Sequence, residues 1–260
     1  MKLRIVPART GLAWVRLGVA TFWRQPLALS GLFFMFMAVM ALAGMVPVFG
    51  IALALALLPA CTLGLMAASR EAEEGRFPMP AVFLSAFRAG RERLRAMLIL
   101  GALYGVGFLL SVGASALIDG GAFASRYLHG QLPTQEMMRQ PSTQVTMLAF
   151  MALQLPLSLM FWHSPALVHW HGVPAVKSIF FSLVACLRNF WAFTVFGLAW
   201  GVLLVGAVLA LSLIATVLGS PTLAAAGMLP LSLMVAAMFF TSTYFSFRDC
   251  FVPDPEGDAA

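Results

Sequence analysis

The sequence predicts an all-α polytopic membrane protein with six transmembrane helices, arranged as three repeated helical hairpins that are each preceded by an interfacial amphipathic helix. Composition points to this class first. Of the 260 residues, 61% are hydrophobic and only 10% are charged, whereas a soluble domain carries roughly 25% charged residues. No core in water could hide so much apolar surface, so lipid must be the solvent for most of it. We expect a single integral membrane domain over residues 1–260.

Six apolar stretches without charge are each long enough to cross a bilayer, which takes about 18 residues or more. They occupy residues 26–46, 48–69, 97–118, 144–163, 190–218 and 222–246. The first pair and the last pair are separated only by short turns, which predicts helical hairpins. The basic start of the chain is similar to that of a signal peptide, but the first stretch has the length of a full span. We therefore expect an uncleaved helix.

Lys and Arg residues are distributed unevenly between the two sides of these spans. Fourteen fall on the side that carries both chain ends, and only Arg126 and Arg139 fall on the other, in the 119–143 connection. The positive-inside rule predicts cytoplasmic termini. With a net charge of +6 beside apolar spans, anionic lipid headgroups are the expected electrostatic partner, and nucleic acid is not. The 119–143 connection is predicted to be a solvated loop, and the acidic residues after Arg248 a disordered tail.

Three parts of the chain share a pattern that predicts an internal repeat, with units near 8–78, 79–174 and 175–253. Each returning span carries a Leu-Pro step, at Pro59, Pro156 and Pro230. Each unit begins with a basic, aromatic-bearing segment whose apolar spacing is typical of a helix at the membrane surface. In the first segment one face is formed by Leu12, Val15, Val19 and Phe22, and in the second Phe83, Phe87 and Leu94 oppose Arg88, Arg91 and Arg95.

The prolines inside the spans have two interpretations. A proline removes a backbone hydrogen bond and kinks a helix, so three equivalent kinks could frame a central cavity or give a hinge. Gln154, two residues before Pro156, is the most polar residue deep in a span. Alternatively the kinks only set helix packing, with the hydroxyls of Thr62, Ser158 and Ser232 bonding the freed carbonyls. We favour the packing interpretation.

Two glycine pairs, Gly101-x-x-x-Gly105 and Gly197-x-x-x-Gly201, match the small-xxx-small motif that lets helix backbones approach closely in a membrane. We expect both to serve packing within the chain, with dimerisation as the alternative.

Patterns for chemistry are weak. The weak metal-ligand candidates His163, His169 and His171 lie near the cytoplasmic end of the fourth span, but no Cys or carboxylate accompanies them and their spacing does not align them on one helix face. All ten acidic residues lie outside the apolar stretches, which disfavours ion-coupled transport and intramembrane proteolysis. The basic residues Arg88, Arg91 and Arg95 are candidates for lipid-headgroup binding. We expect no catalytic residue, no cofactor, and no disulfide among the three cysteines.

Several local stretches carry a resemblance to a known family: VPARTGLAWV at 6–15, WRQPLAL at 23–29, and LPA at 58–60 with GLMAASR at 64–70. Through them the chain resembles an uncharacterised family of six-span bacterial inner-membrane proteins, found chiefly in β-proteobacteria. More distantly, the plan is similar to the membrane domain of some glycerophosphodiester phosphodiesterases, whose catalytic domain this sequence lacks. The resemblance implies a bacterial inner-membrane location and brings no active residues.

These observations favour a non-enzymatic inner-membrane protein that acts as a scaffold or accessory subunit of a membrane or envelope system, in contact with another membrane protein. The alternative is an uncoupled carrier or channel for a lipid or a small apolar solute, with the proline-kinked spans along the path. A third hypothesis, a membrane enzyme that uses the histidines at 163–171, predicts bound metal.

Overall fold

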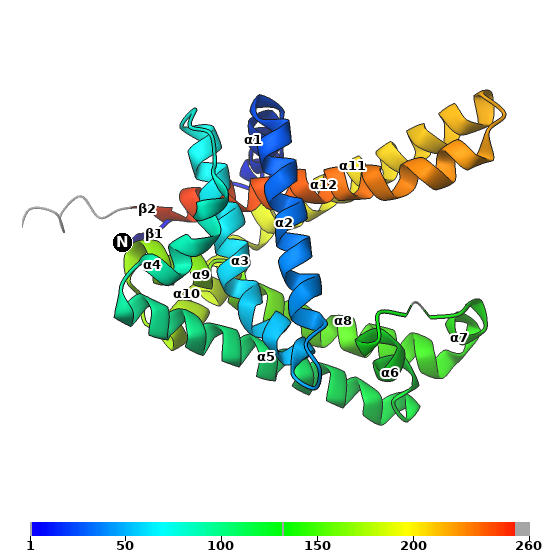
Figure 1. Cartoon of the computed structure of the whole chain (residues 1–260), viewed down its shortest axis with the longest axis horizontal. Helices are drawn as coiled ribbons and strands as arrows, with labels where there is room; N and C mark the ends of the chain where they lie inside the picture. Colours follow the sequence, from blue (N-terminus) through cyan, green and yellow to red (C-terminus); the bar gives the residue numbers. More distant parts are fainter. Residues whose placement is uncertain (1, 132, 253–260) are drawn as a thin grey trace, which may run out of the picture. The chain divides into compact units, whose positions relative to one another are not determined.

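The computed structural model describes residues 2–131 and 133–252, which are almost entirely helical (Figure 1). The elements are β1 (Lys2–Leu3), α1 (Thr10–Arg24), α2 (Pro26–Gly44), α3 (Gly50–Glu73), the 3-10 helix η1 (Pro80–Leu84), α4 (Ser85–Arg88), α5 (Arg91–Asp119), α6 (Ala122–Leu128), α7 (Gln135–Arg139), α8 (Pro141–Phe161), α9 (Ser164–His171), α10 (Ala175–Arg188), α11 (Phe190–Val217), α12 (Pro221–Cys250) and β2 (Phe251–Val252). The two strands pair in antiparallel fashion.

Within this part of the chain, six helical segments are long and apolar enough to cross a membrane, as predicted: Pro26–Gly44, Gly50–Glu73, Arg91–Asp119, Pro141–His171, Phe190–Val217 and Thr222–Cys250. Some of these helices continue past the apolar stretch, and α5 begins at Arg91 rather than at residue 97. Polar side chains can extend a helix because its backbone bonds are internal, and long basic side chains reach the headgroup layer. Apolar runs therefore underestimate helix length.

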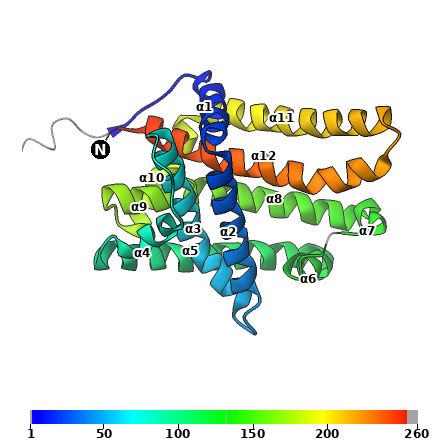
Figure 2. The same cartoon turned by 45° about the horizontal axis from the view of Figure 1, so that its top comes forward.

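The chain forms two compact units. The first contains the residues up to Met37, Thr62–Ser85 and the residues from Val184 on, and the second contains Ala38–Cys61 and Ala86–Leu183. In the first unit α11 and α12 lie side by side (Figures 1 and 2), and α1 packs on both of them.

The first amphipathic segment, α1, buries part of the predicted face, at Val15 and Phe22, but not all of it. Its buried residues are Gly11, Trp14, Val15, Gly18, Thr21 and Phe22, whereas Leu12 is exposed. The reason is close backbone contact: a Cβ at Gly11 would collide with the Ala192 carbonyl of α11, and one at Gly18 with Ser242 of α12. Glycine carries no apolar signal, so hydrophobic spacing alone misses the part of this face that Gly11 and Gly18 form.

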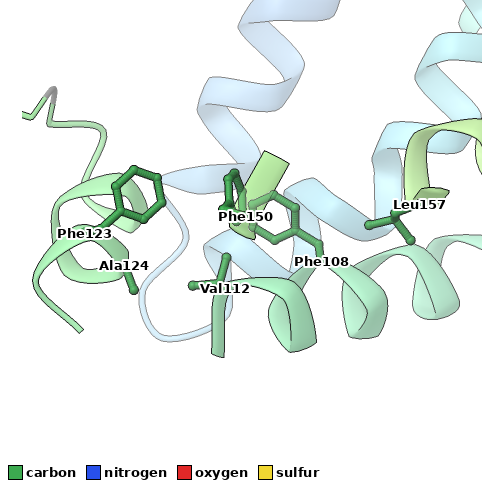
Figure 3. Packing of buried hydrophobic residues seen from close by; sticks show 6 residues of the cluster. All are labelled: Phe108, Val112, Phe123, Ala124, Phe150 and Leu157. Atoms are coloured by element: carbon green, nitrogen blue, oxygen red, sulfur yellow. The ribbon is translucent and has the colours of Figure 1, made fainter. Parts of the chain in front are cut away.

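The core of the second unit includes Phe108 and Val112 of α5, Phe123 of α6, and Phe150 and Leu157 of α8 (Figure 3). The prediction of a plain solvated loop at 119–143 is therefore wrong, because α6 and α7 lie in this connection and Phe123 is 6% exposed. The side chain of Asp119 accepts hydrogen bonds from the backbone N–H groups of Gly121, at 3.0 Å, and Phe123, at 2.8 Å, at the start of α6. Such capping stabilises a helix too short to show a period.

The second amphipathic segment is broken rather than continuous. Gly90, at φ +98°, separates α4 from α5, so Arg88 ends one helix while Arg91 and Arg95 open the next. A left-handed glycine interrupts a helix at little steric cost. The third segment forms one helix, α10. The threefold repeat stays a prediction. Of the predicted acidic tail, Asp254, Glu256 and Asp258 lie outside the described residues, as does the end of the third repeat unit.

Candidate functional site

The three histidines near the end of α8 have different surroundings. His163 is fully buried directly before α9, and its backbone N–H donates to Ser182 Oγ at 3.0 Å. That hydroxyl donates in turn to the Leu159 carbonyl at 2.7 Å, which ties the α8–α9 junction to α10. His169 and His171, in the last turn of α9, are half-buried. Among the described residues, no group of three His, Cys, Asp or Glu side chains lies close enough to hold a metal ion.

The three prolines lie inside helices that continue past them, α3, α8 and α12. Pro59 is buried, whereas Pro156 and Pro230 are exposed. The predicted rescue of the freed carbonyl does not occur at Pro230. The bond lost there would have reached the carbonyl of Ala226, but Ser232 Oγ donates to Met228 at 2.8 Å. This is the ordinary bond of a hydroxyl to the carbonyl four residues earlier.

Gln154 is half-buried in α8, and its Oε1 is buried without a hydrogen-bond partner in the described part of the chain. A buried amide oxygen costs free energy when it is unpaired, so Gln154 is an unfavourable polar residue in its helix. The structure places it on the same helix as Pro156, two residues away.

A polar network that the sequence did not reveal lies at one end of the first unit. Trp14 Nε1 donates to Asp249 Oδ2 at 2.9 Å, and Trp14 is completely buried. Arg248 pairs with both Asp249 and Glu73, and its guanidinium lies 5.0 Å from the centre of the Phe245 ring. These contacts join α1, α3 and α12, so the charges near the helix ends serve tertiary packing.

Asn189, between α10 and α11, is a second residue that the sequence did not reveal. It is 2% exposed. Its Oδ1 accepts from the Val6 N–H at 2.7 Å, and its Nδ2 donates to the carbonyls of Arg4 at 3.1 Å and Ala185 at 3.0 Å. The only available signal was one amide side chain between a basic helix end and an apolar stretch. Asn189 fastens the N-terminal segment to the start of α11.

The two glycine pairs differ in their surroundings. In α5, a Cβ at Gly101 would collide with the Ala56 carbonyl of α3, and one at Gly105 would lie 3.6 Å from Leu55. That pair packs within the chain, as expected. In α11, nothing lies within 4 Å of a Cβ built at Gly197 or Gly201, nor at Gly206.

The open glycines of α11 line an apolar groove of about 500 Å³. Leucine and valine side chains form its rims, at Leu198, Val202, Val205 and Leu209. Each of these four is more than half exposed. Among the described residues of the first unit, no helix covers this side of α11, so the expected packing within the chain is not found there for this pair. A glycine-floored groove on a transmembrane helix lets a second helix backbone approach closely, and we take it as the candidate functional site.

Comparison with known proteins gives one informative relative. The chain is 38% identical, over 254 residues, to a protein of Burkholderia thailandensis described as a probable inner membrane protein. The match covers 96% of this chain and 94% of that protein. No family model matches the chain, and no solved structure matches it. The distant similarity to phosphodiesterase membrane domains stays a prediction.

Proposed function

The chain belongs to the same family of bacterial inner membrane proteins as this Burkholderia protein, and we propose that it is a non-enzymatic scaffold or accessory subunit that binds another membrane protein through α11. With its six apolar helices, it is a multi-pass protein of the inner membrane. The proposal includes cytoplasmic termini, in accord with the excess of basic residues on that side.

The open glycine groove of α11 is the observation that carries this proposal. Some other helix glycines are covered by a neighbouring backbone, as Gly11 is by Ala192 and Gly101 is by Ala56. Gly31 and Gly113 are open as well, but α11 differs because three open glycines line one groove. Glycine in a helix interior is unfavourable by roughly 1 kcal/mol relative to alanine. Three glycines that meet no neighbour among the described residues of the first unit therefore carry this cost without a packing contact there to offset it. A partner helix seated in the groove would supply that compensation by van der Waals contact.

The charged network supports a role without catalysis. Arg248 pairs with both Glu73 and Asp249, and Asp249 also accepts a hydrogen bond from the buried indole of Trp14. Their capacity for charge-assisted hydrogen bonds is used in holding helices together. The carrier alternative depends on a path lined by Gln154, Thr62, Ser158 and Ser232, and the grooves and cavities described here are lined by other residues.

The test compares which proteins co-purify with the wild type and with two variants, each extracted from its native membrane in polymer nanodiscs. The wild type is examined beside Gly201→Leu, which fills the groove, and Gly113→Leu, which fills an open position of α5 outside it. Neither leucine meets a neighbouring atom at its Cβ, so both variants should fold. We expect a second protein at a fixed ratio by mass spectrometry with the wild type and Gly113→Leu, and its loss with Gly201→Leu.

Two results would count against this role. Recovery of the same partner at the same ratio with Gly201→Leu would remove α11 as the interface. Recovery of one enriched lipid class with no stoichiometric protein would favour the carrier.

A further inference from the structure

A cavity of about 440 Å³ lies in the second unit where α5 begins, between its first two turns and the connection from α9 to α10. Arg93 and Arg95 line it together with Glu92, and its apolar wall includes Ala96, Ile99 and Val168. Val168 is 1% exposed whereas Ile99 is 39% exposed, so this wall extends from the packed interior to the surface of the unit. The cavity therefore has one basic and one apolar side.

The basic side has unsatisfied capacity for an anion. In the described part of the chain, neither Arg93 nor Arg95 makes an ion pair, whereas Arg70, Arg76 and Arg248 of the first unit all pair with acidic side chains. Glu92 offsets one charge, which leaves the lining side chains at a net charge of +1.

Two helix ends add to this positive potential. The cavity borders the first turn of α5 and Ala175, the first residue of α10. The N–H groups of a first helical turn lack acceptors within the helix, and they carry the positive end of the helix dipole.

The order of residues along α5 indicates which anion fits. Ile99 follows Arg93 by six residues, which corresponds to about 9 Å along a helix, so the basic and apolar parts of the cavity lie at successive depths of the same membrane-spanning helix. A free anion would use the basic part alone. A phospholipid places its phosphate at the headgroup layer and its first acyl carbons deeper, and so matches both parts.

We propose that this cavity is a binding site for one anionic phospholipid, with its phosphate at Arg93 and Arg95 and its upper acyl carbons against Ala96 and Ile99. The site differs from the headgroup candidates expected from the sequence, because Arg93 replaces Arg88 and Arg91. This lipid site is independent of the proposed α11 interface apart from the membrane that both require. The lipid titration involves no protein partner, so the two proposals can fail separately.

The test is native mass spectrometry of the full chain in neutral detergent, titrated with dioctanoyl phosphatidylglycerol, dioctanoyl phosphatidylcholine or inorganic phosphate. The double variant Arg93→Gln/Arg95→Gln removes two charges inside the cavity, and Arg88→Gln/Arg91→Gln removes two charges outside it. A basic residue near anionic lipid contributes about 1 kcal/mol. We therefore expect the first variant to bind phosphatidylglycerol about 30-fold more weakly and the second to bind nearly as the wild type does.

Three results would overturn the proposal. Equal loss in both double variants would mean general attraction of basic side chains to lipid. Equal affinity for phosphatidylglycerol and phosphatidylcholine would show that the headgroup charge does not determine binding. Displacement of the lipid by an equal concentration of inorganic phosphate would assign the site to a free anion. Melting temperatures measured without lipid check folding. The single variant Arg95→Gln, with an expected loss of about fivefold, replaces the double variant if that one does not fold.

Discussion

Replacement of Asn189 by alanine tests whether one buried amide holds the N-terminal segment to the membrane helices. The substitution leaves the N–H of Val6 without its acceptor and the carbonyl of Arg4 without its donor. Val6 is 8% exposed, whereas Arg4 is exposed. Water can therefore replace the amide at the Arg4 carbonyl and cannot easily do so at the Val6 N–H.

The expected loss follows from these two groups. A buried donor without an acceptor costs about 1–3 kcal/mol, and the weaker loss at Arg4 adds a fraction of that. The bond from Asn189 Nδ2 to Cys250 Sγ, at 3.6 Å, adds little. We expect Asn189→Ala to destabilise the protein by about 2–3 kcal/mol, which lowers the melting temperature of a chain of this size by about 5–10 °C.

The protein carries its own reporters for this measurement. Cys61, Cys186 and Cys250 are buried thiols that form no disulfide in the described part of the chain, so a fluorogenic maleimide reacts with them only as the fold opens. Thr194→Ala is the matched control, because Thr194 is also near the start of α11 but bonds only to Phe190 within its own helix. Equal melting temperatures for Asn189→Ala and Thr194→Ala would refute the assignment of Asn189 as a fastening residue.

Three further outcomes are expected. Phe123→Ala empties a position in the aromatic core of the second unit and should lower the free energy of unfolding by about 2–4 kcal/mol. The control Phe49→Ala, at a side chain 69% exposed, should change thermal unfolding little. Equal effects of the two substitutions would contradict the packing of α6. Val48 has φ +67°, which is costly for a β-branched residue, so Val48→Gly should raise the melting temperature, and a lower value would contradict the strain. Burial, reinforced by the neighbouring Cys250, raises the pKa of the Cys186 thiol above its ordinary value of 9.0. The folded state then keeps this proton at a pH where the unfolded state loses it, so stability is complete below about pH 9 and falls above it. The melting temperature, followed by tryptophan fluorescence, should fall less between pH 8 and pH 10 for Cys186→Ala than for the wild type. An equal fall in both proteins would show that Cys186 is not the cause.

Several features of this protein follow from sequence alone because each depends on local composition. Six uncharged stretches are long enough to span a bilayer, and all six form helices. The fold class and the membrane setting follow from the same apolar runs, since lipid accepts only backbone whose hydrogen bonds are internally satisfied. The second amphipathic segment shows the limit of this approach, because its apolar spacing looked continuous although Gly90 divides it.

Only the tertiary structure decided which faces pair and which polar groups meet. Gly11 and Gly18 seat α1 on α11 and α12, whereas Gly197 and Gly201 meet no neighbour among the described residues of the first unit. The sequence does not distinguish the covered glycines from the open ones, because a glycine shows where another backbone can approach and not whether one does. Asn189 and Asp249 likewise find partners more than 180 residues away. Apolar periodicity is a local property that each helix carries in its own residues, but contacts between distant helices depend on how the whole chain packs, and one sequence contains no measure of that.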